Sequence, residues 1–282
     1  MTLKRLGFAY NPTTEDAPEL RERAAGWCRI RGVEYWAAPA GETAALVEQL
    51  PGTDALIVLG GDGTFLRAAR AVAEVDVPLL GINRGKVGFL SKAEAEELEP
   101  MLERLERGAF TVHERMGLTG EILAAGFPAA TRTTFTALND IVVARGSLAR
   151  VVRLDVTIDS SHLATFVADG LVVSSPTGST GYSFSAGGPI VEPQSRNLIV
   201  TPIAGYLSAI RSVVAGPSGS VRCRIVDAHE ALVSIDGRED HRIEVGDVVE
   251  VRALERPIRF VEPDGAMPFW DLLRTKVQLL PS

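Results

Sequence analysis

One short glycine-rich segment carries the residue that is best suited to chemistry in this sequence. Gly60-Gly61-Asp62-Gly63-Thr64 lies between the apolar run Ala55–Leu59 and a helical pattern over residues 64–73. Glycines let a backbone approach a ligand closely, and a strand-to-helix turn presents free N–H groups to phosphate. A carboxylate is unfavourable there unless it acts, so Asp62 is predicted to bind Mg²⁺, orient a hydroxyl group or accept its proton. The alternative is a tight turn in which Asp62 caps the helix.

Two neighbouring features extend this candidate phosphate site. Arg67 follows Asp62 by about one helical turn, from where its guanidinium could pair with a diphosphate; a solvated helix arginine is the alternative. The segment 81–90, GINRGKVGFL, follows the next apolar run and carries Arg84 and Lys86 between glycines. Because successive strand ends of an open α/β sheet line one crevice, we expect a second phosphate-facing loop here.

Polar groups also gather in the second half of the chain. Asn139-Asp140 stands between apolar neighbours, and an amide beside a carboxylate can hold the vicinal hydroxyl groups of a ribose; a turn or cap is the alternative. The segment 169–189, DGLVVSSPTGSTGYSFSAGGP, ends a strand at Ser174 and then crowds hydroxyl groups and glycines together. We predict one loop that forms many hydrogen bonds with a polar ligand and offers the aromatic face of Tyr182.

The elements that position these residues change along the chain. Strands are expected over residues 6–10, 55–59 and 78–82, and helices over 19–32, 64–73 and 98–105. From about Phe110 onwards, β-branched residues and threonines predict strands over 131–135, 151–156, 231–235, 242–245 and 248–251, with a hairpin at Gly246-Asp247 between the last two. The tail from 269 to 280 is again helix-like. The pattern therefore predicts an α/β domain followed by a mostly β domain.

Bulk composition narrows the class of protein. The 282 residues are 46% hydrophobic and 23% charged, which is typical of a globular chain. The net charge of −7 argues against nucleic-acid binding, and no apolar run approaches the roughly 18 residues of a membrane span. The N-terminus lacks a signal-peptide pattern and the only cysteines are Cys28 and Cys223, so a cytoplasmic location is expected.

In combination, these segments resemble the NAD kinase family over nearly the whole chain. Gly-Gly-Asp-Gly-Thr alone is shared with lipid kinases and phosphofructokinases, but its order with Asn-Asp and the segment 169–189 is specific. The resemblance implies a Rossmann-like, phosphofructokinase-like α/β domain over residues 1–113 and an all-β, sandwich-like dinucleotide-binding domain over 114–261. It also implies that residues 262–282 pack back onto the first domain and that a substrate cleft lies between the domains.

The same resemblance implies an activity: transfer of the γ-phosphoryl group of ATP to the 2′-hydroxyl group of the adenosine ribose of NAD, giving NADP. Asp62 corresponds to the catalytic aspartate, Asn139 and Asp140 to the pair that holds ribose hydroxyl groups, and Asp169 to the contact with the nicotinamide ribose. The other implied nucleotide- and substrate-binding residues are Gly60, Gly61, Gly63, Thr64, Phe65, Arg67, Arg150, Thr180, Gly181, Tyr182, Ser183, Ser185 and Arg238.

The implied cofactor is Mg²⁺ or another divalent cation. It is expected to arrive with the nucleotide rather than in a dedicated protein site, with Asp62 as the one protein group considered as a ligand. The expected partners are NAD and ATP, with no nucleic acid and no membrane, and the family commonly forms homodimers or homotetramers. Sequence alone leaves open whether ATP or polyphosphate is the donor, whether NAD or NADH is preferred, and whether NADP(H) regulates the enzyme.

Two other classes of protein share parts of this pattern. A diacylglycerol- or sphingosine-type lipid kinase would carry the same glycine-rich segment, but it needs an apolar acyl pocket and some affinity for membranes. A non-catalytic dinucleotide sensor would bind NAD without turnover, but a pure phosphate binder gains nothing from Asp62. Formation of NADP separates the three interpretations.

Overall fold

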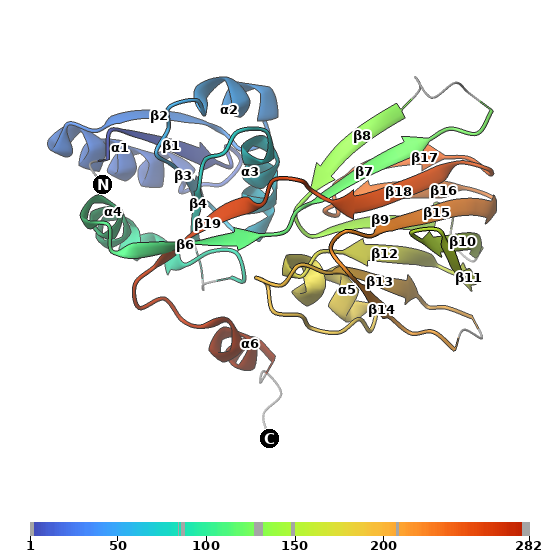
Figure 1. Cartoon of the computed structure of the whole chain (residues 1–282). Coiled ribbons are helices and arrows are strands. Elements are labelled where there is room, and N and C mark those ends of the chain that lie inside the picture. The colour runs from blue at the N-terminus through green and yellow to red at the C-terminus, as the bar shows by residue number, and fades with distance from the viewer. Residues whose placement is uncertain are drawn as a thin grey trace. The chain divides into compact units, whose positions relative to one another are not determined.

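The chain forms two compact units in the computed structural model, which describes residues 3–83, 85, 88–126, 132–147, 150–206 and 209–277. The first unit comprises residues 1–114 and 258–282, and the second comprises residues 115–257. In Figure 1 the first unit runs from blue to green and ends in red. The sequence places the second boundary at residue 261. In the structure, the strand that starts at Ile258 belongs to the first unit, because Phe260 pairs in parallel with Leu79.

The first unit is built on one sheet whose central strands are parallel. The strand order is β2-β1-β3-β4-β19-β6, with β5 beside β4. The strands are β1 (Arg5–Tyr10), β2 (Glu34–Pro39), β3 (Ala55–Leu59), β4 (Leu79–Asn83), β5 (Ala93–Glu94), β6 (Phe110–Arg115) and β19 (Ile258–Pro263). Every residue of β3 is buried, as expected for a central strand that is covered on both faces.

Helices cover both faces of this sheet (Figure 1). The helices of the first unit are α1 (Ala17–Arg31), α2 (Thr43–Gln49), α3 (Asp62–Glu74), the short 3₁₀ helix η1 (Ala95–Glu97), α4 (Leu98–Arg107) and α6 (Phe269–Val277). Helices α1 and α4 share an apolar cluster with Leu80 and Ile82 of β4. Gly81 lies between these two residues, so its side-chain position faces the opposite side of the sheet. There the ring of Phe65 from α3 packs against Gly81. The expected Rossmann-like layering is confirmed.

Two further features of the helices bear on the sequence expectations. Helix α4 ends at Gly108, which adopts a left-handed backbone with a φ of 70°, as the sequence indicates. Helix α6 packs within the first unit, where the ring of Phe269 lies 6.2 Å from that of Phe89. Within the described part of the chain, no helix is both long and apolar enough to cross a membrane.

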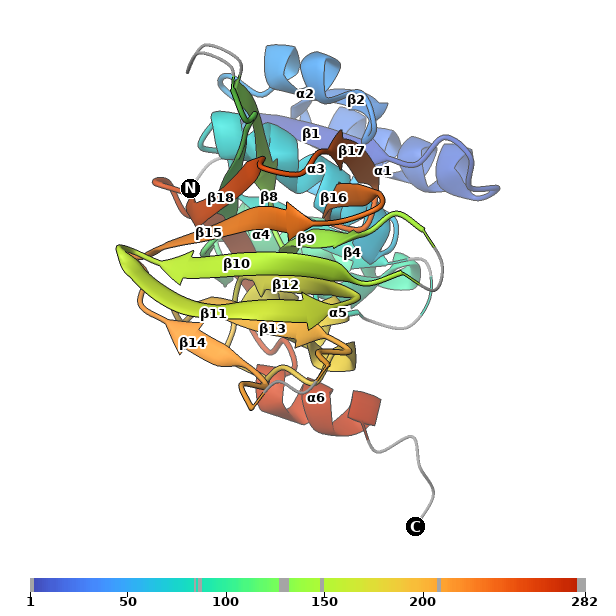
Figure 2. The same ribbon diagram turned by 90° about the vertical axis from the view of Figure 1, so that its right-hand side faces the viewer.

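The second unit is a sandwich of two six-stranded sheets with antiparallel pairing. Their orders are β11-β10-β15-β18-β7-β8 and β14-β13-β12-β9-β16-β17, and Figure 2 shows β10 and β11 side by side. The strands are β7 (Leu118–Leu123), β8 (Arg132–Ala137), β9 (Asp140–Arg145), β10 (Val152–Ile158), β11 (Ser161–Ala168), β12 (Gly170–Ser174), β13 (Leu198–Ile203), β14 (Val213–Ala215), β15 (Ser220–Asp227), β16 (Ala231–Ile235), β17 (Glu239–Ile243) and β18 (Val248–Ala253). Both sheets contribute apolar residues to one buried core, so the expected sandwich is confirmed.

The prediction of a hairpin at Gly246-Asp247 is wrong. Strand β17 pairs with β16 in one sheet, whereas β18 pairs with β15 and β7 in the other. The segment is a corner between the sheets: Asp247 accepts the backbone N–H groups of Ala125 and Glu244, at 2.8 and 2.9 Å. Gly246 has a φ of 98°, so the turn signal was genuine. A local signal does not say which strands pair across it.

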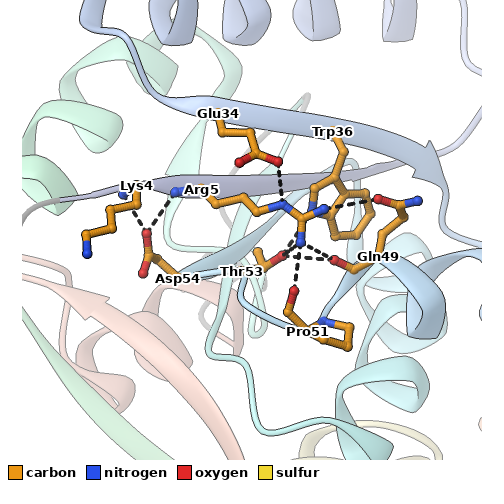
Figure 3. Close-up of polar contacts among 8 residues, drawn as sticks. All are labelled: Lys4, Arg5, Glu34, Trp36, Gln49, Pro51, Thr53 and Asp54. Atoms are coloured by element: carbon orange, nitrogen blue, oxygen red, sulfur yellow. Dashed lines mark hydrogen bonds and ion pairs between the residues drawn. The ribbon is translucent and has the colours of Figure 1, made fainter.

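The amino ends of β1, β2 and β3 are tied together by Arg5 (Figure 3). Its guanidinium donates to Glu34 Oε1 at 3.0 Å, to the carbonyl oxygen of Gln49 at 2.8 Å and to that of Pro51 at 2.7 Å. The planar fork of an arginine can satisfy several acceptors at once, which a lysine ammonium on a flexible stem does less well. Arg5 therefore fixes the end of α2 to the edge of the sheet that lies opposite Asp62.

We expect Arg5→Lys to lower the free energy of unfolding of the first unit by about 1–3 kcal/mol, because several hydrogen bonds to a charged group are lost. Urea denaturation followed by tryptophan fluorescence is the measurement, since Trp27, Trp36 and Trp270 all lie in the first unit. Arg107→Lys is the matched control, because the Arg107 side chain is 73% exposed in its ion pair with Glu103. Equal unfolding midpoints in the two variants would contradict this role of Arg5.

Candidate functional site

Asp62 is the first residue of helix α3, at the carboxyl end of the central strand β3. Gly61 is the residue that precedes the helix, with φ of −76° and ψ of −179°, and as a glycine it has no side chain with which to cap the helix. The interpretation of Asp62 as a helix cap is therefore wrong. The helix also begins two residues earlier than the hydrophobic pattern indicates. The carboxylate of Asp62 is therefore free of the capping role that an aspartate most often has at the start of a helix.

The carboxylate of Asp62 is desolvated. Its Oδ1 atom is buried and has no hydrogen-bond partner among the described residues. Burial raises the pKa of this carboxyl group, while the backbone N–H groups of Leu90 and Phe89 and the positive charge of Lys276 act in the opposite direction. A carboxylate with a raised pKa is a stronger base, and a buried oxygen without a partner is favourably placed to meet a ligand hydroxyl group or a cation.

The loop after β4 approaches Asp62, as expected for adjacent parallel strand ends. Gly60 donates its N–H to the carbonyl oxygen of Ile82 at 2.9 Å. Gly88 lies against the carboxylate so closely that a Cβ at this position would collide with Asp62. The small size of residue 88 is therefore required by the position of Asp62. Arg84 and Lys86, the two cations of the expected phosphate-facing loop, lie outside the described residues.

The side chains of Thr64 and Phe65 support the turn from inside. Thr64 is 7% exposed and contacts Gly60, where a Cβ would lie 2.7 Å from the threonine Oγ1. Phe65 is 1% exposed and its ring lies 5.0 Å from that of Phe260. A contact between either residue and a nucleotide would have to come from the backbone. Arg67 is half-buried one turn further along α3.

In the second unit, Asn139 and Asp140 lie at the tight connection between β8 and β9. Asp140 is 5% exposed, and burial together with the nearby charge of Asp236 raises the pKa of its carboxyl group to about 7. The Oδ1 atom of Asn139 is buried, without a hydrogen-bond partner in the described part of the chain. The pair thus presents a desolvated amide and a desolvated carboxyl group side by side, and these are groups that a ribose can satisfy.

The segment after β12 is not a simple loop. It contains a 3₁₀ helix, η2 (Thr177–Thr180), and one helical turn, α5 (Tyr182–Ser185). Its serine hydroxyl groups turn inward: Ser175 Oγ donates to the carbonyl oxygen of Leu138 at 2.6 Å, and Ser179 Oγ donates to that of Pro176 at 2.7 Å. Most of the hydroxyl groups expected to bind a ligand therefore build the segment itself.

Two glycines bring this segment to the Asn139-Asp140 pair. A Cβ on Gly178 would collide with the backbone of Asn139. A Cβ on Gly181 would lie 3.8 Å from Asn139 Nδ2 and 4.0 Å from Asp140 Oδ2. Of the predicted contact residues here, Ser183 is fully buried and its Oγ lies 3.4 Å from Thr201 Oγ1, while Tyr182 is 46% exposed. Thr180 donates to the carbonyl oxygen of Thr177 at 3.3 Å, and Ser185 is exposed.

Asp169 lines a cavity of about 300 Å³ together with Tyr182 and Arg145. Arg145 forms a two-pronged ion pair with the Asp169 carboxylate, with N–O distances of 2.8 and 3.3 Å. Sequence reasoning predicted Asp169 but missed Arg145, because nothing in the local pattern marks a partner 24 residues away. The predicted residues Asp169 and Tyr182 are brought together by the fold.

The two remaining predicted arginines are exposed and lie on different sheets. Arg238 follows the turn between β16 and β17, and its N–H donates to the carbonyl oxygen of Ile235 at 3.1 Å. That turn contains Asp236, which contacts the Asn139-Asp140 pair and which sequence reasoning missed. Arg150 precedes β10 in the other sheet.

Comparison with known families covers most of the chain. The model of the ATP-NAD kinase N-terminal domain matches residues 3–110, and that of the ATP-NAD kinase C-terminal domain matches residues 138–263. The chain is 35% identical over 284 residues to an NAD kinase of Syntrophotalea carbinolica, a match that covers 98% of each protein. It is 42% identical over 232 residues to an NAD kinase of Moorella thermoacetica, which covers 82% of this chain and 73% of that protein.

Two solved structures share the fold. Yeast NADH kinase complexed with NADH matches with a TM-score of 0.85 at 24% identity, covering 99% of this chain and 88% of that one. An NAD kinase from Archaeoglobus fulgidus in complex with ATP matches with a TM-score of 0.75 at 25% identity, covering 98% of this chain and all of that one.

The raised pKa of Asp140 predicts a pH-dependent stability. In the unfolded chain an aspartate titrates near 3.9, but in the folded protein Asp140 titrates at about 7. Between these values the folded state holds the extra proton, so the contribution of Asp140 to the free energy of unfolding falls as the pH rises from about 4 to about 7. Asp140→Asn should therefore gain stability relative to the unmodified protein across this window, by about 1.4 kcal/mol for each pH unit.

Urea denaturation followed by far-UV circular dichroism from pH 4.5 to pH 8 measures this difference. Asp227→Asn, at an exposed position on β15, is the control and should run parallel to the unmodified protein. If Asp140→Asn also runs parallel across the whole range, the carboxyl group of Asp140 is not perturbed.

Proposed function

Since the chain belongs to the NAD kinase family, we propose that Asp62 acts on the attacking hydroxyl group and that Asn139 and Asp140 hold the ribose of NAD. The enzyme transfers the γ-phosphoryl group of ATP to the adenosine-ribose 2′-hydroxyl group of NAD. The observation that carries the proposed roles is the desolvated carboxylate of Asp62, with an oxygen that has no partner in the described residues, at the carboxyl end of a central parallel strand. Ligands of open α/β sheets bind at this edge.

Asp62 supplies the base in this proposal. The 2′-oxygen of NAD forms a bond to the γ-phosphorus as the bond between that phosphorus and the bridging oxygen of ADP breaks. The hydroxyl proton passes to the Asp62 carboxylate, whose raised pKa makes it a better acceptor than an exposed aspartate. Because phosphoryl transfer depends mainly on positioning, the same carboxylate also orients the hydroxyl group in line with the γ-phosphorus.

A divalent cation, Mg²⁺ in our proposal, would enter with the nucleotide and neutralise charge on the phosphate oxygens. The residues present fit such an ion, because the buried Oδ1 of Asp62 is a hard oxygen ligand with no partner in the described residues. The start of α3 and the preceding Gly61 would present N–H groups to the phosphates, whereas the N–H of Gly60 is already bonded to the carbonyl oxygen of Ile82. Arg67 lies one turn further along that helix and is the candidate side-chain cation.

The second unit binds the dinucleotide in this proposal. The amide of Asn139 and the carboxyl group of Asp140 accept and donate hydrogen bonds to ribose hydroxyl groups, which leaves a ligand without those groups at a disadvantage. Tyr182 offers its half-exposed ring, and the cavity beside Asp169 is the candidate subsite for the nicotinamide ribose. ATP in the solved Archaeoglobus structure supports ATP as the donor.

We also propose that the enzyme is a cytoplasmic homodimer or homotetramer. Both cysteines are free and buried, as expected in a reducing compartment. Strands β14, β17, β11 and β8 are the terminal strands of the two sheets of the second unit. Such edges favour pairing between copies of a chain.

The proposed role of Asp62 predicts that Asp62→Asn lowers kcat by roughly 10²–10⁴-fold, the usual contribution of a general base. The assay is NADP formation from NAD, ATP and Mg²⁺, read through an NADP-specific dehydrogenase. Asparagine keeps the size and the helix position of Asp62 but cannot accept the proton. Near-normal turnover in this variant would exclude an essential carboxylate.

A second prediction uses the close approach of Gly88. Gly88→Ala should displace the Asp62 carboxylate, because the added methyl group would overlap it, and should lower kcat while the unfolding midpoint stays close to that of the unmodified enzyme. Gly85→Ala in the same loop is the matched control, since no atom of the other described residues lies within 4 Å of a Cβ at that position. Equal kcat values for the two alanine variants would show that the position of the carboxylate does not limit turnover.

A further inference from the structure

The connection that carries Asn139 and Asp140 is held by one carboxylate from the hairpin of β16 and β17. Asp236 accepts the backbone N–H of Leu138 on Oδ2 at 3.1 Å, and those of Asn139 and Asp140 on Oδ1 at 2.8 and 3.2 Å. In return, the N–H of Asp236 donates to the carbonyl oxygen of Asp140 at 3.0 Å. Asp236 is 7% exposed, so these charge-assisted hydrogen bonds form away from solvent.

The carbonyl side of the same connection is also bound. Ser175 donates two hydrogen bonds to these carbonyl groups. Its Oγ donates to the carbonyl oxygen of Leu138 at 2.6 Å, and its backbone N–H donates to the carbonyl oxygen of Asn139 at 2.8 Å. With its N–H groups held by Asp236 and its carbonyl groups held by Ser175, the backbone of this connection is committed to the protein. The buried Oδ1 of Asn139, by contrast, has no partner in the described residues.

The need for a turn does not explain Asp236 by itself. Asp236 and Gly237 have φ values of 51° and 65°, as the two central residues of a type I′ turn require. Asparagine serves that backbone at least as well as aspartate. Only a carboxylate, however, offers two acceptor oxygens to three N–H groups, because the amide nitrogen of asparagine would face one of them as a second donor.

We propose that Asp236 is a positioning residue for NAD binding: its carboxylate fixes the backbone of Asn139 and Asp140, and thereby the direction in which both side chains meet the ribose. The inference rests on the proposed function of this pair. Asp236 itself touches no substrate in this account and acts through its two neighbours. Through its hydrogen bonds, Asp236 links the turn between β16 and β17 to the connection between β8 and β9, which is the proposed ribose-binding segment.

The test compares steady-state kinetics of Asp236→Asn with those of three other proteins. The unmodified enzyme gives the reference values, and Asn139→Ala tests the proposed role of the pair itself. Asp159→Asn is the matched control: Asp159 is also left-handed, with a φ of 56°, and accepts the N–H of Ser220 at 2.9 Å in a turn of the other sheet. The Michaelis constants for NAD and for ATP, kcat and the unfolding midpoint are measured for each.

We expect Asp236→Asn to raise the KM for NAD roughly tenfold, as the loss of a charge-assisted hydrogen bond would, while the KM for ATP and kcat stay within about twofold. Asp159→Asn should leave the KM for NAD, the KM for ATP and kcat unchanged. An unchanged KM for NAD in Asp236→Asn, with an increase in Asn139→Ala, would overturn the inference alone. No increase in Asn139→Ala would overturn the proposed role of the pair.

Hydrogen exchange gives a readout that does not depend on activity. The amides of residues 138–140 should exchange slowly in the unmodified enzyme and faster in Asp236→Asn, when followed by mass spectrometry of the peptide that contains them. A different outcome would overturn the positioning role and show that Asp236 is a scaffold residue. In that outcome, Asp236→Asn raises the KM for both substrates, lowers kcat and the unfolding midpoint, and speeds exchange throughout the second unit.

Discussion

The desolvated carboxylate of Asp62 is the constraint on which the first unit depends. A buried carboxylate oxygen without a partner is unfavourable, so the surrounding structure must hold it in place. The parallel pairing of β3 with β4 brings the two strand ends together, Gly88 leaves room for the carboxylate, and the buried ring of Phe65 anchors α3 to the sheet. On the opposite edge, Arg5 ties the strand starts to α2. The contacts of Arg5 at the amino ends of the strands thus stabilise the sheet whose carboxyl ends position Asp62.

The second unit solves a related problem with backbone groups. Here the chain turns tightly at Asn139 and Asp140, and Ser175 and Asp236 satisfy its backbone. Satisfying the backbone from within leaves the side chains available, which is how a segment rich in serine can be rigid and still serve a binding site. The same arrangement raises the pKa of Asp140, because burial and the Asp236 charge both disfavour a second negative charge.

Sequence reasoning located the strongest signals and missed the long-range ones. Strand β3 and the end of α4 at Gly108 were predicted because a continuous apolar run and a terminal glycine are local patterns. Strand β2 and helix α2 were not predicted, since each buries only one residue, Ala38 in β2 and Leu46 in α2, so neither has a clear periodicity. Partners such as Arg145 for Asp169 and Asp236 for Asn139 arise from pairing between distant strands, which no local pattern records.

The central claim is that Asp62 acts on the chemical step and not on the binding of NAD. The most direct measurement is the dissociation constant of NAD for Asp62→Asn by isothermal titration calorimetry, beside the rate of a single turnover at saturating NAD and ATP. The account predicts a dissociation constant within about threefold of the unmodified enzyme and a single-turnover rate lower by roughly 10²–10⁴-fold. A normal rate at saturation with a much weaker affinity for NAD would contradict it and would make Asp62 a binding residue.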